Sequence, residues 1–142
     1  MSGKNYRFAL AVSHFNQEIT DGLLCGAQSA LAECYVYSQD VEVFRAPGAF
    51  ELPLLAQQLA ATKRFDAIIC LGAVIRGATP HFDYVAGAAQ QGILDVGLKY
   101  NLPVMFGVVT VNTIEQARER SGNNPMNRGR EAALAAVELL TT

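Results

Sequence analysis

The stretch Ala67-Ile-Ile-Cys-Leu71 is apolar at every position. A strand with one face in solvent alternates apolar and polar residues, so an uninterrupted apolar run predicts a strand that is buried on both faces. Strands of this kind lie inside parallel sheets that helices cover on either side. The stretch therefore predicts an α/β fold with residues 67–71 inside its sheet.

On both sides of this segment the chain alternates between strand and helix patterns. Short apolar runs predict three further strands, at 8–12, 41–44 and 104–109. Apolar residues at helical spacing predict helices at about 19–31, 52–59, 80–99, 113–120 and 127–140. Thr113 and Gln116 fit a capping box at the start of the fourth of these helices. The alternation predicts a single domain over residues 1–142, a three-layer α-β-α sandwich with a four-stranded, parallel, flavodoxin-like sheet.

Charge and hydropathy exclude several classes of protein. Eleven Lys and Arg against 13 Asp and Glu give a net charge of −2, which is not the basic balance of a nucleic-acid-binding protein. No stretch approaches the ~20 apolar residues of a membrane span, and the run at 8–12 is too short for a signal peptide. We therefore expect a cytoplasmic protein whose partners are neither nucleic acids nor membranes.

The three cysteines, Cys25, Cys34 and Cys70, are odd in number and form no Cys-x-x-Cys pair. This pattern favours neither a disulfide framework nor a zinc site. We expect three buried, reduced thiols and no metal centre.

In a sheet of this class, ligands bind beyond the carboxyl ends of the strands. The richest segment there runs Gly72-Ala-Val-Ile-Arg-Gly-Ala-Thr-Pro-His-Phe-Asp83. Gly77, Ala78 and Thr79 are small, so their backbone N–H groups could approach an anion at the start of the next helix. The spacing from Gly72 to Thr79 resembles a P-loop without its lysine, which favours a single phosphate over a nucleoside triphosphate. A tight strand-to-helix turn explains the small residues equally well.

His81 lies just inside the same helix, and its imidazole titrates near neutrality, which suits proton transfer. The alternative is a histidine of the first turn that packs on Phe82. Asp83 could orient the ring or simply complement the helix dipole.

Other candidates also have two interpretations. Phe15, after the first strand, could stack on a planar ligand or fill the loop. Glu51 could accept hydrogen bonds from a substrate or complement a helix dipole. Arginine suits phosphate recognition, but four arginines close to the C-terminus could also form a solvated face. These four are Arg118, Arg120, Arg128 and Arg130.

Taken in order, several motifs are far more specific than any one of them. They are Ser-His-Phe-Asn16, Pro-Gly-Ala-Phe-Glu-Leu-Pro53, the segment from Gly72 to Val85, Phe-Gly-Val-Val-Thr110, Ile-Glu-Gln-Ala-Arg-Glu-Arg-Ser-Gly122 and Asn-Arg-Gly129. From about residue 7 to residue 140 the chain resembles the lumazine synthase family of riboflavin biosynthesis.

The resemblance implies the condensation of 5-amino-6-(D-ribitylamino)uracil with 3,4-dihydroxy-2-butanone 4-phosphate. The product is 6,7-dimethyl-8-ribityllumazine, with release of phosphate and water, in the penultimate step of riboflavin biosynthesis. No redox step occurs, so no cofactor is implied.

The resemblance also implies a role for each candidate. His81 is the proton-transfer residue, Phe15 stacks on the pyrimidine, and Arg120 binds the phosphate together with Thr79 and the backbone of residues 77–78. Contacts to the ribityl chain and pyrimidine come from Ala49, Phe50 and Glu51 and from the backbone near Val74 and Ile75. Phe106 and Arg128 match positions that line the site from a neighbouring subunit.

The family forms pentamers or multiples of pentamers, so the resemblance implies a homo-oligomer, with riboflavin synthase as a further partner. Extensive subunit contact would account for a chain that is 51% hydrophobic and only 17% charged. The alternative is a relative that binds flavin or lumazine without catalysis, or that only forms a shell. His14 and Arg128 depart from the family, which commonly has arginine and lysine at these positions.

Overall fold

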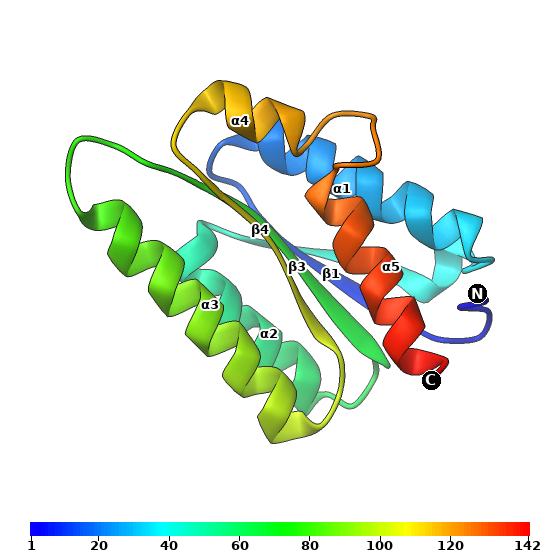
Figure 1. Ribbon diagram of the computed structural model, residues 1–142. Coiled ribbons are helices and arrows are strands. Elements are labelled where there is room, and N and C mark those ends of the chain that lie inside the picture. The colour runs from blue at the N-terminus through cyan, green and yellow to red at the C-terminus, as the bar shows by residue number, and fades with distance from the viewer.

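The computed structural model describes all 142 residues and contains a parallel sheet of four strands (Figure 1). The strands are β1 (Phe8–Ser13), β2 (Val41–Ala46), β3 (Ala67–Ile75) and β4 (Val104–Val111). Their order across the sheet is β2-β1-β3-β4, so β1 and β3 are the central strands. The predicted fold class is confirmed, and residues 67–71 lie inside the sheet as expected.

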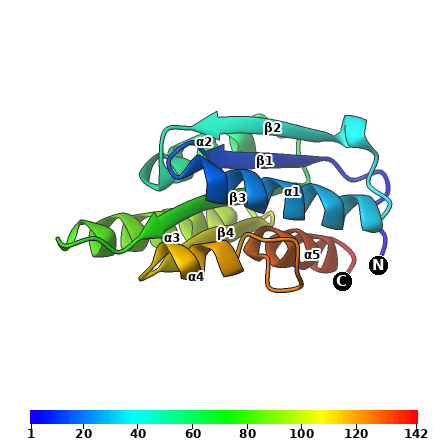
Figure 2. The ribbon, with the colours of Figure 1, turned by 90° about the horizontal axis from the view of Figure 1, so that it is seen from above.

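Helices cover both faces of the sheet. One face carries α1 (Gln17–Glu33), α4 (Ile114–Glu119) and α5 (Arg128–Leu140); the other carries α2 (Leu52–Ala61) and α3 (His81–Tyr100) (Figures 1 and 2). Both termini lie at one end of the molecule, where the Tyr6 hydroxyl donates to the Leu140 carbonyl (3.1 Å). Two short 3-10 helices, Ser38–Asp40 and Ala49–Glu51, were not predicted.

The capping box predicted for α4 is present. The backbone N–H of Gln116 donates to Thr113 Oγ1 (3.1 Å), and that of Thr113 donates to Gln116 Oε1 (3.2 Å). These two bonds satisfy N–H groups that have no partner within the helix. They fix the point at which the chain turns from β4 into α4.

Alternation along the central strands divides the core into two layers. In β1, Phe8, Leu10 and Val12 belong to the layer under α1 and α5, whereas Ala9 and Ala11 belong to the layer under α2 and α3. Both layers are buried, which is why the central strands show no polar alternation.

The structure corrects the P-loop-like interpretation of Gly72. This residue lies within β3, which extends to Ile75 because β4 continues to Val111 and pairs with it. A Cβ at position 72 would lie 2.9 Å from Ser13 Oγ, so glycine allows a close approach here rather than a turn. The strand-to-helix loop is limited to residues 76–80.

The expectation of three buried thiols is also wrong for one cysteine. Cys34 and Cys70 are buried, whereas Cys25 lies on the exposed face of α1. All three are free thiols. Burial raises the pKa of the Cys70 thiol to about 12, so this group stays protonated and unreactive.

Close packing between α1 and the start of α5 depends on small residues and on one buried amide. A Cβ at Gly129 would overlap the carbonyl oxygen of Leu23. Asn127 accepts a hydrogen bond from the Arg130 backbone (3.0 Å) and donates to the carbonyls of Gly22 (3.1 Å) and Gly122 (2.9 Å). This contact fixes the segment that leads from α4 to α5.

Replacing Gly129 with alanine should therefore lower the free energy of unfolding by about 2 kcal/mol, because the added methyl group forces backbone apart. Denaturation in urea at a fixed protein concentration measures the change. Gly87→Ala is the matched control: the position is helical, its Cβ would meet nothing within 4 Å, and the helix should gain roughly 0.5–1 kcal/mol. Equal changes in the free energy of unfolding of the two variants would contradict the close contact between Gly129 and Leu23.

Candidate active site

A cavity of about 680 Å³ lies at the carboxyl edge of the sheet. We call it the histidine cavity. It is lined by Phe15 after β1, by residues 47–51 after β2, by residues 73–75 of β3 with Gly77 and Thr79 of the following loop, and by His81, Phe82, Tyr84 and Val85 of α3. Because β2 and β3 lie on opposite sides of β1, the cavity forms where the strand order reverses, the usual ligand site of such sheets.

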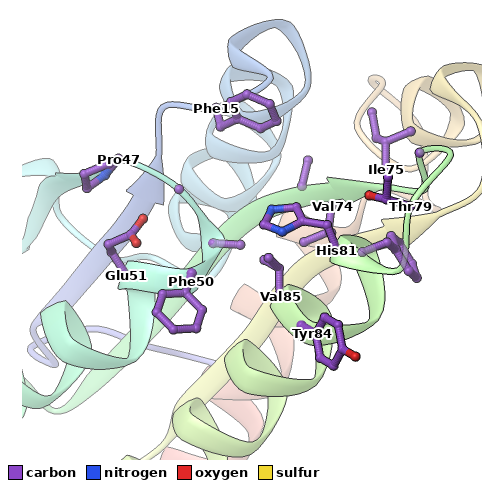
Figure 3. Close-up of a pocket in the computed structure, with 15 residues that line it drawn as sticks. Phe15, Pro47, Phe50, Glu51, Val74, Ile75, Thr79, His81, Tyr84 and Val85 are labelled. Carbon is purple, nitrogen blue, oxygen red and sulfur yellow. The ribbon is translucent and has the colours of Figure 1, made fainter.

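Most of the residues predicted for the site line this one cavity (Figure 3). They are Phe15, Ala49, Phe50, Glu51, Val74, Ile75, Gly77, Thr79 and His81. Ala78 is exposed and does not line the cavity itself, although both of its neighbours do.

His81 is the first residue of α3, and its imidazole lies among the lining side chains, between Phe50 and Glu51 on one side and Thr79 on the other (Figure 3). The side chain has no hydrogen-bond partner within the chain. Asp83 does not orient the ring, because its carboxylate pairs with Arg76 (3.4 Å). The imidazole is therefore available to a bound molecule.

Two hydrogen bonds bring Phe15 across from residues 47–51. The backbone N–H groups of His14 and Phe15 donate to the carbonyls of Ala46 (2.8 Å) and Pro47 (3.2 Å). The chain then turns into α1 through Asn16, which has a left-handed backbone (φ 62°). Phe15 is left 68% exposed, as a ring available for stacking rather than a plug of the core.

The 3-10 turn Ala49–Glu51 supplies the wall below Phe15. Ala49 is buried, whereas the ring of Phe50 is 59% exposed and the Glu51 side chain has no ion-pair partner. The wall thus combines an aromatic face with a free carboxylate. Such a pair suits a planar ligand that carries hydroxyl or N–H donors.

A second cavity, of about 420 Å³, is lined by three further predicted residues, Phe106, Arg120 and Arg128. We call it the arginine cavity. It is lined by Phe106, residues 108–112, Gln116, Glu119, Arg120 and Arg128. Within one chain, then, Arg120 lies apart from the Thr79 loop with which it was expected to bind phosphate.

The four arginines near the C-terminus divide into two pairs. Arg118 binds Glu18 of α1 (2.9 Å) and Arg130 binds Glu33 of α1 (2.7 Å); these hydrogen bonds hold the pKa values of both carboxyls below their usual range. Arg120 has no acidic partner, and Arg128 faces Glu131 at 3.7 Å. Arg118 and Arg130 thus link α4 and α5 to α1. Arg120 and Arg128 line the arginine cavity.

Several lining residues of the histidine cavity were not predicted: Pro47, Gly48, Ala73, Phe82, Tyr84 and Val85. A signal for Val85 was present, since it lies four residues after His81 and therefore on the same face of α3. No group of three or more metal-ligating side chains occurs in the structure. None of its helices combines the length and the apolar character that crossing a bilayer requires.

Comparisons with known proteins agree on one family. The family model described as 6,7-dimethyl-8-ribityllumazine synthase matches residues 5–142. A 6,7-dimethyl-8-ribityllumazine synthase of Syntrophus aciditrophicus is 50% identical over 137 residues, which cover 96% of this chain and 89% of that protein. A 6,7-dimethyl-8-ribityllumazine synthase of Protochlamydia amoebophila is 52% identical over 134 residues, which cover 94% of this chain and 78% of that protein. The chain therefore belongs to the 6,7-dimethyl-8-ribityllumazine synthase family.

Proposed function

We propose that the chain catalyses the condensation of 5-amino-6-(D-ribitylamino)uracil with 3,4-dihydroxy-2-butanone 4-phosphate to give 6,7-dimethyl-8-ribityllumazine. The observation that carries the proposal is the histidine cavity, in which an unpartnered imidazole lies between an aromatic, carboxylate-bearing wall and a loop suited to an anion. Membership of the family supports the same reaction.

The pyrimidine binds between β1 and β2 in this account. Phe15 stacks on the ring, and the Glu51 carboxylate accepts hydrogen bonds from N–H or hydroxyl groups. Ala49 and Phe50 line the path of the ribityl chain, and backbone groups near residues 74–75 complete the contacts. A cavity of about 680 Å³ lies within the range of small-molecule sites.

His81 moves protons during the reaction. An amine of the pyrimidine attacks the ketone, and loss of water gives an imine. Phosphate then leaves, and the second nitrogen closes the ring with loss of another water. Each step takes a proton from nitrogen or carbon, or gives one to a leaving oxygen, and an imidazole can do both near neutral pH. Holding the two substrates side by side supplies much of the remaining acceleration.

The phosphate lies at the loop before α3. The backbone N–H groups of residues 77–78, the Thr79 hydroxyl and the positive end of the α3 dipole all favour an anion there. Arg120 would complete this site, but it lies in the arginine cavity of the same chain. We therefore propose that the arginine cavity of one subunit faces the histidine cavity of the next, so that Arg120, Arg128 and Phe106 come from a neighbour.

Exposed apolar side chains support a subunit interface of this kind. Tyr84, Leu94 and Leu98 of α3 are 72%, 53% and 73% exposed, and Leu54 of α2 is 60% exposed. A contact that uses different surfaces on its two sides gives a ring when the rotation between neighbouring subunits closes. The assembly proposed is a pentamer or a multiple of pentamers. An association with riboflavin synthase stays a prediction from the family resemblance, and a cytoplasmic location stays a prediction from the sequence.

Mixing the two substrates with the protein tests the function, with product followed by lumazine fluorescence and phosphate release measured in parallel. We expect a rate well above that of the spontaneous condensation. A rate equal to the spontaneous one, in a protein that binds flavin or lumazine, would support the non-catalytic alternative instead. Light scattering during size-exclusion chromatography gives the assembly state.

A further inference from the structure

Arg76 lies outside both cavities but contacts an element of each. It follows the last residue of β3, and its backbone N–H donates to the Val111 carbonyl of β4 (2.9 Å). Its side-chain Nε donates to Asn112 Oδ1 (2.9 Å), and its Nη2 lies 3.4 Å from Asp83 Oδ1. The guanidinium also stacks on the ring of Phe82, 4.5 Å from its centroid. One side chain thus joins the end of β4 to the first turn of α3.

The first turn of α3 packs against the core through Phe82 and Val85, but it has no side-chain cap. Its N-cap residue is Pro80, and no side chain caps the free N–H groups of this helix end. The helices α1 and α2 also lack such a cap, whereas α4 and α5 begin with one. Phe82 and Asp83, the two residues held by Arg76, follow His81 directly. The contact with Arg76 therefore acts on the turn that carries the imidazole.

We propose that Arg76 is a positioning residue that holds the first turn of α3, and with it the His81 imidazole, in the orientation needed for proton transfer. The proposal rests on the proposed function. Arg76 is also linked to the arginine cavity through Asn112, which lines that cavity. The backbone N–H of Asn112 donates to Gln116 Oε1 (2.8 Å). The phosphate loop at residues 77–79 begins at the residue after Arg76, so the same contact fixes that loop.

The planar guanidinium is essential to this role. It stacks on Phe82 while two of its nitrogens reach acceptors on different elements. A lysine keeps the charge but offers a single nitrogen and no flat face. We therefore expect Arg76→Lys to lose the contacts that position the first turn of α3. Asp83→Asn keeps the acceptor oxygen, so its kcat should be close to that of the unaltered protein.

The test compares Arg76→Lys and Asp83→Ala with the unaltered protein. Each variant should lower kcat roughly tenfold, since small displacements of catalytic groups are costly. The KM for the pyrimidine should stay within about twofold, because the side chains proposed to bind it follow β1 and β2. The effects of the two changes should not add in the double variant. Arg64→Lys is the matched control: Arg64 also stacks on a phenylalanine, Phe65 (4.9 Å), and pairs with a carboxylate, but away from the cavities.

Hydrogen exchange followed by mass spectrometry gives a readout that does not depend on activity. Backbone amides of residues 76–85 should exchange faster in Arg76→Lys than in Arg64→Lys, while exchange in the central strands stays unchanged. Unchanged kcat and unchanged exchange in Arg76→Lys would overturn the proposal. If the unaltered protein forms no lumazine, the proposed function fails, and the exchange comparison alone then decides whether Arg76 holds this turn.

Discussion

Replacing His81 with alanine should lower kcat by about 100-fold and leave a rate above the spontaneous condensation. This is the lower end of what a positioned acid–base side chain contributes. A residual rate is expected because, under the proposed function, the cavity still holds the two substrates together on Phe15, Glu51 and the loop before α3. Steady-state kinetics with lumazine fluorescence measures the change.

His14→Ala is the control for this variant, because His14 is the one other histidine of the chain and does not line the cavity. It should leave kcat essentially unchanged. Complete loss of activity in His81→Ala, with folding and pyrimidine binding intact, would show that proximity supplies little of the acceleration. An unchanged kcat would remove His81 from the mechanism.

Arg120→Ala should raise the KM for the phosphate substrate about 30-fold and leave the KM for the pyrimidine nearly unchanged. A hydrogen bond between charged groups contributes roughly 1.5–3 kcal/mol, which corresponds to a change of this size. Arg120 has no acidic partner in the chain, so its guanidinium is free to bind an anion. Initial rates at varied concentrations of each substrate separate the two effects.

Arg118→Ala is the matched control, since it removes an arginine only two residues from Arg120 that is already paired with Glu18. It should change neither KM by more than about twofold, because an exposed ion pair contributes little. If Arg120→Ala leaves the KM for the phosphate substrate unchanged, Arg120 does not bind the phosphate.

The fold could be predicted from the sequence because local and global signals agree. The apolar run at 67–71 indicates a strand covered on both faces, and Thr113 with Gln116 marks the start of α4 at the residue found. The end of β3 could not be predicted in the same way. Gly72 reads as the start of a turn, and only its pairing with Val108 of β4 makes it part of a strand.

Some residues of the candidate site could be predicted from their place after a strand, whereas others depend on partners far away in the sequence. His81, Glu51 and Phe15 follow the ends of strands, and the rule for parallel sheets brings such residues together. The arginines depend on distant partners instead. Nothing near Arg118 or Arg130 in sequence shows that α1 supplies each with a glutamate about 100 residues away. The same holds for Asp83, whose partner proved to be Arg76 rather than the imidazole.

The division of the predicted site residues between two cavities is the least predictable feature, because the sheet rule says nothing of residues that follow α4. The family resemblance assigned Phe106 and Arg128 to a neighbour. The structure groups Arg120 with them. The proposed phosphate site, made from the loop of one subunit and the arginine of the next, would make activity depend on assembly. It also accounts for a chain with few charges and many exposed apolar side chains on α3.

Co-assembly of the His81→Ala and Arg120→Ala variants tests this claim most directly. The two are unfolded together, refolded as a mixture and assayed at a phosphate-substrate concentration below KM. In a ring with a shared site, about a quarter of the sites pair an intact His81 with an intact Arg120 from the neighbour. A shared site should give activity well above that of either variant refolded alone. Activity equal to the average of the two variants would show that each site is built within one chain.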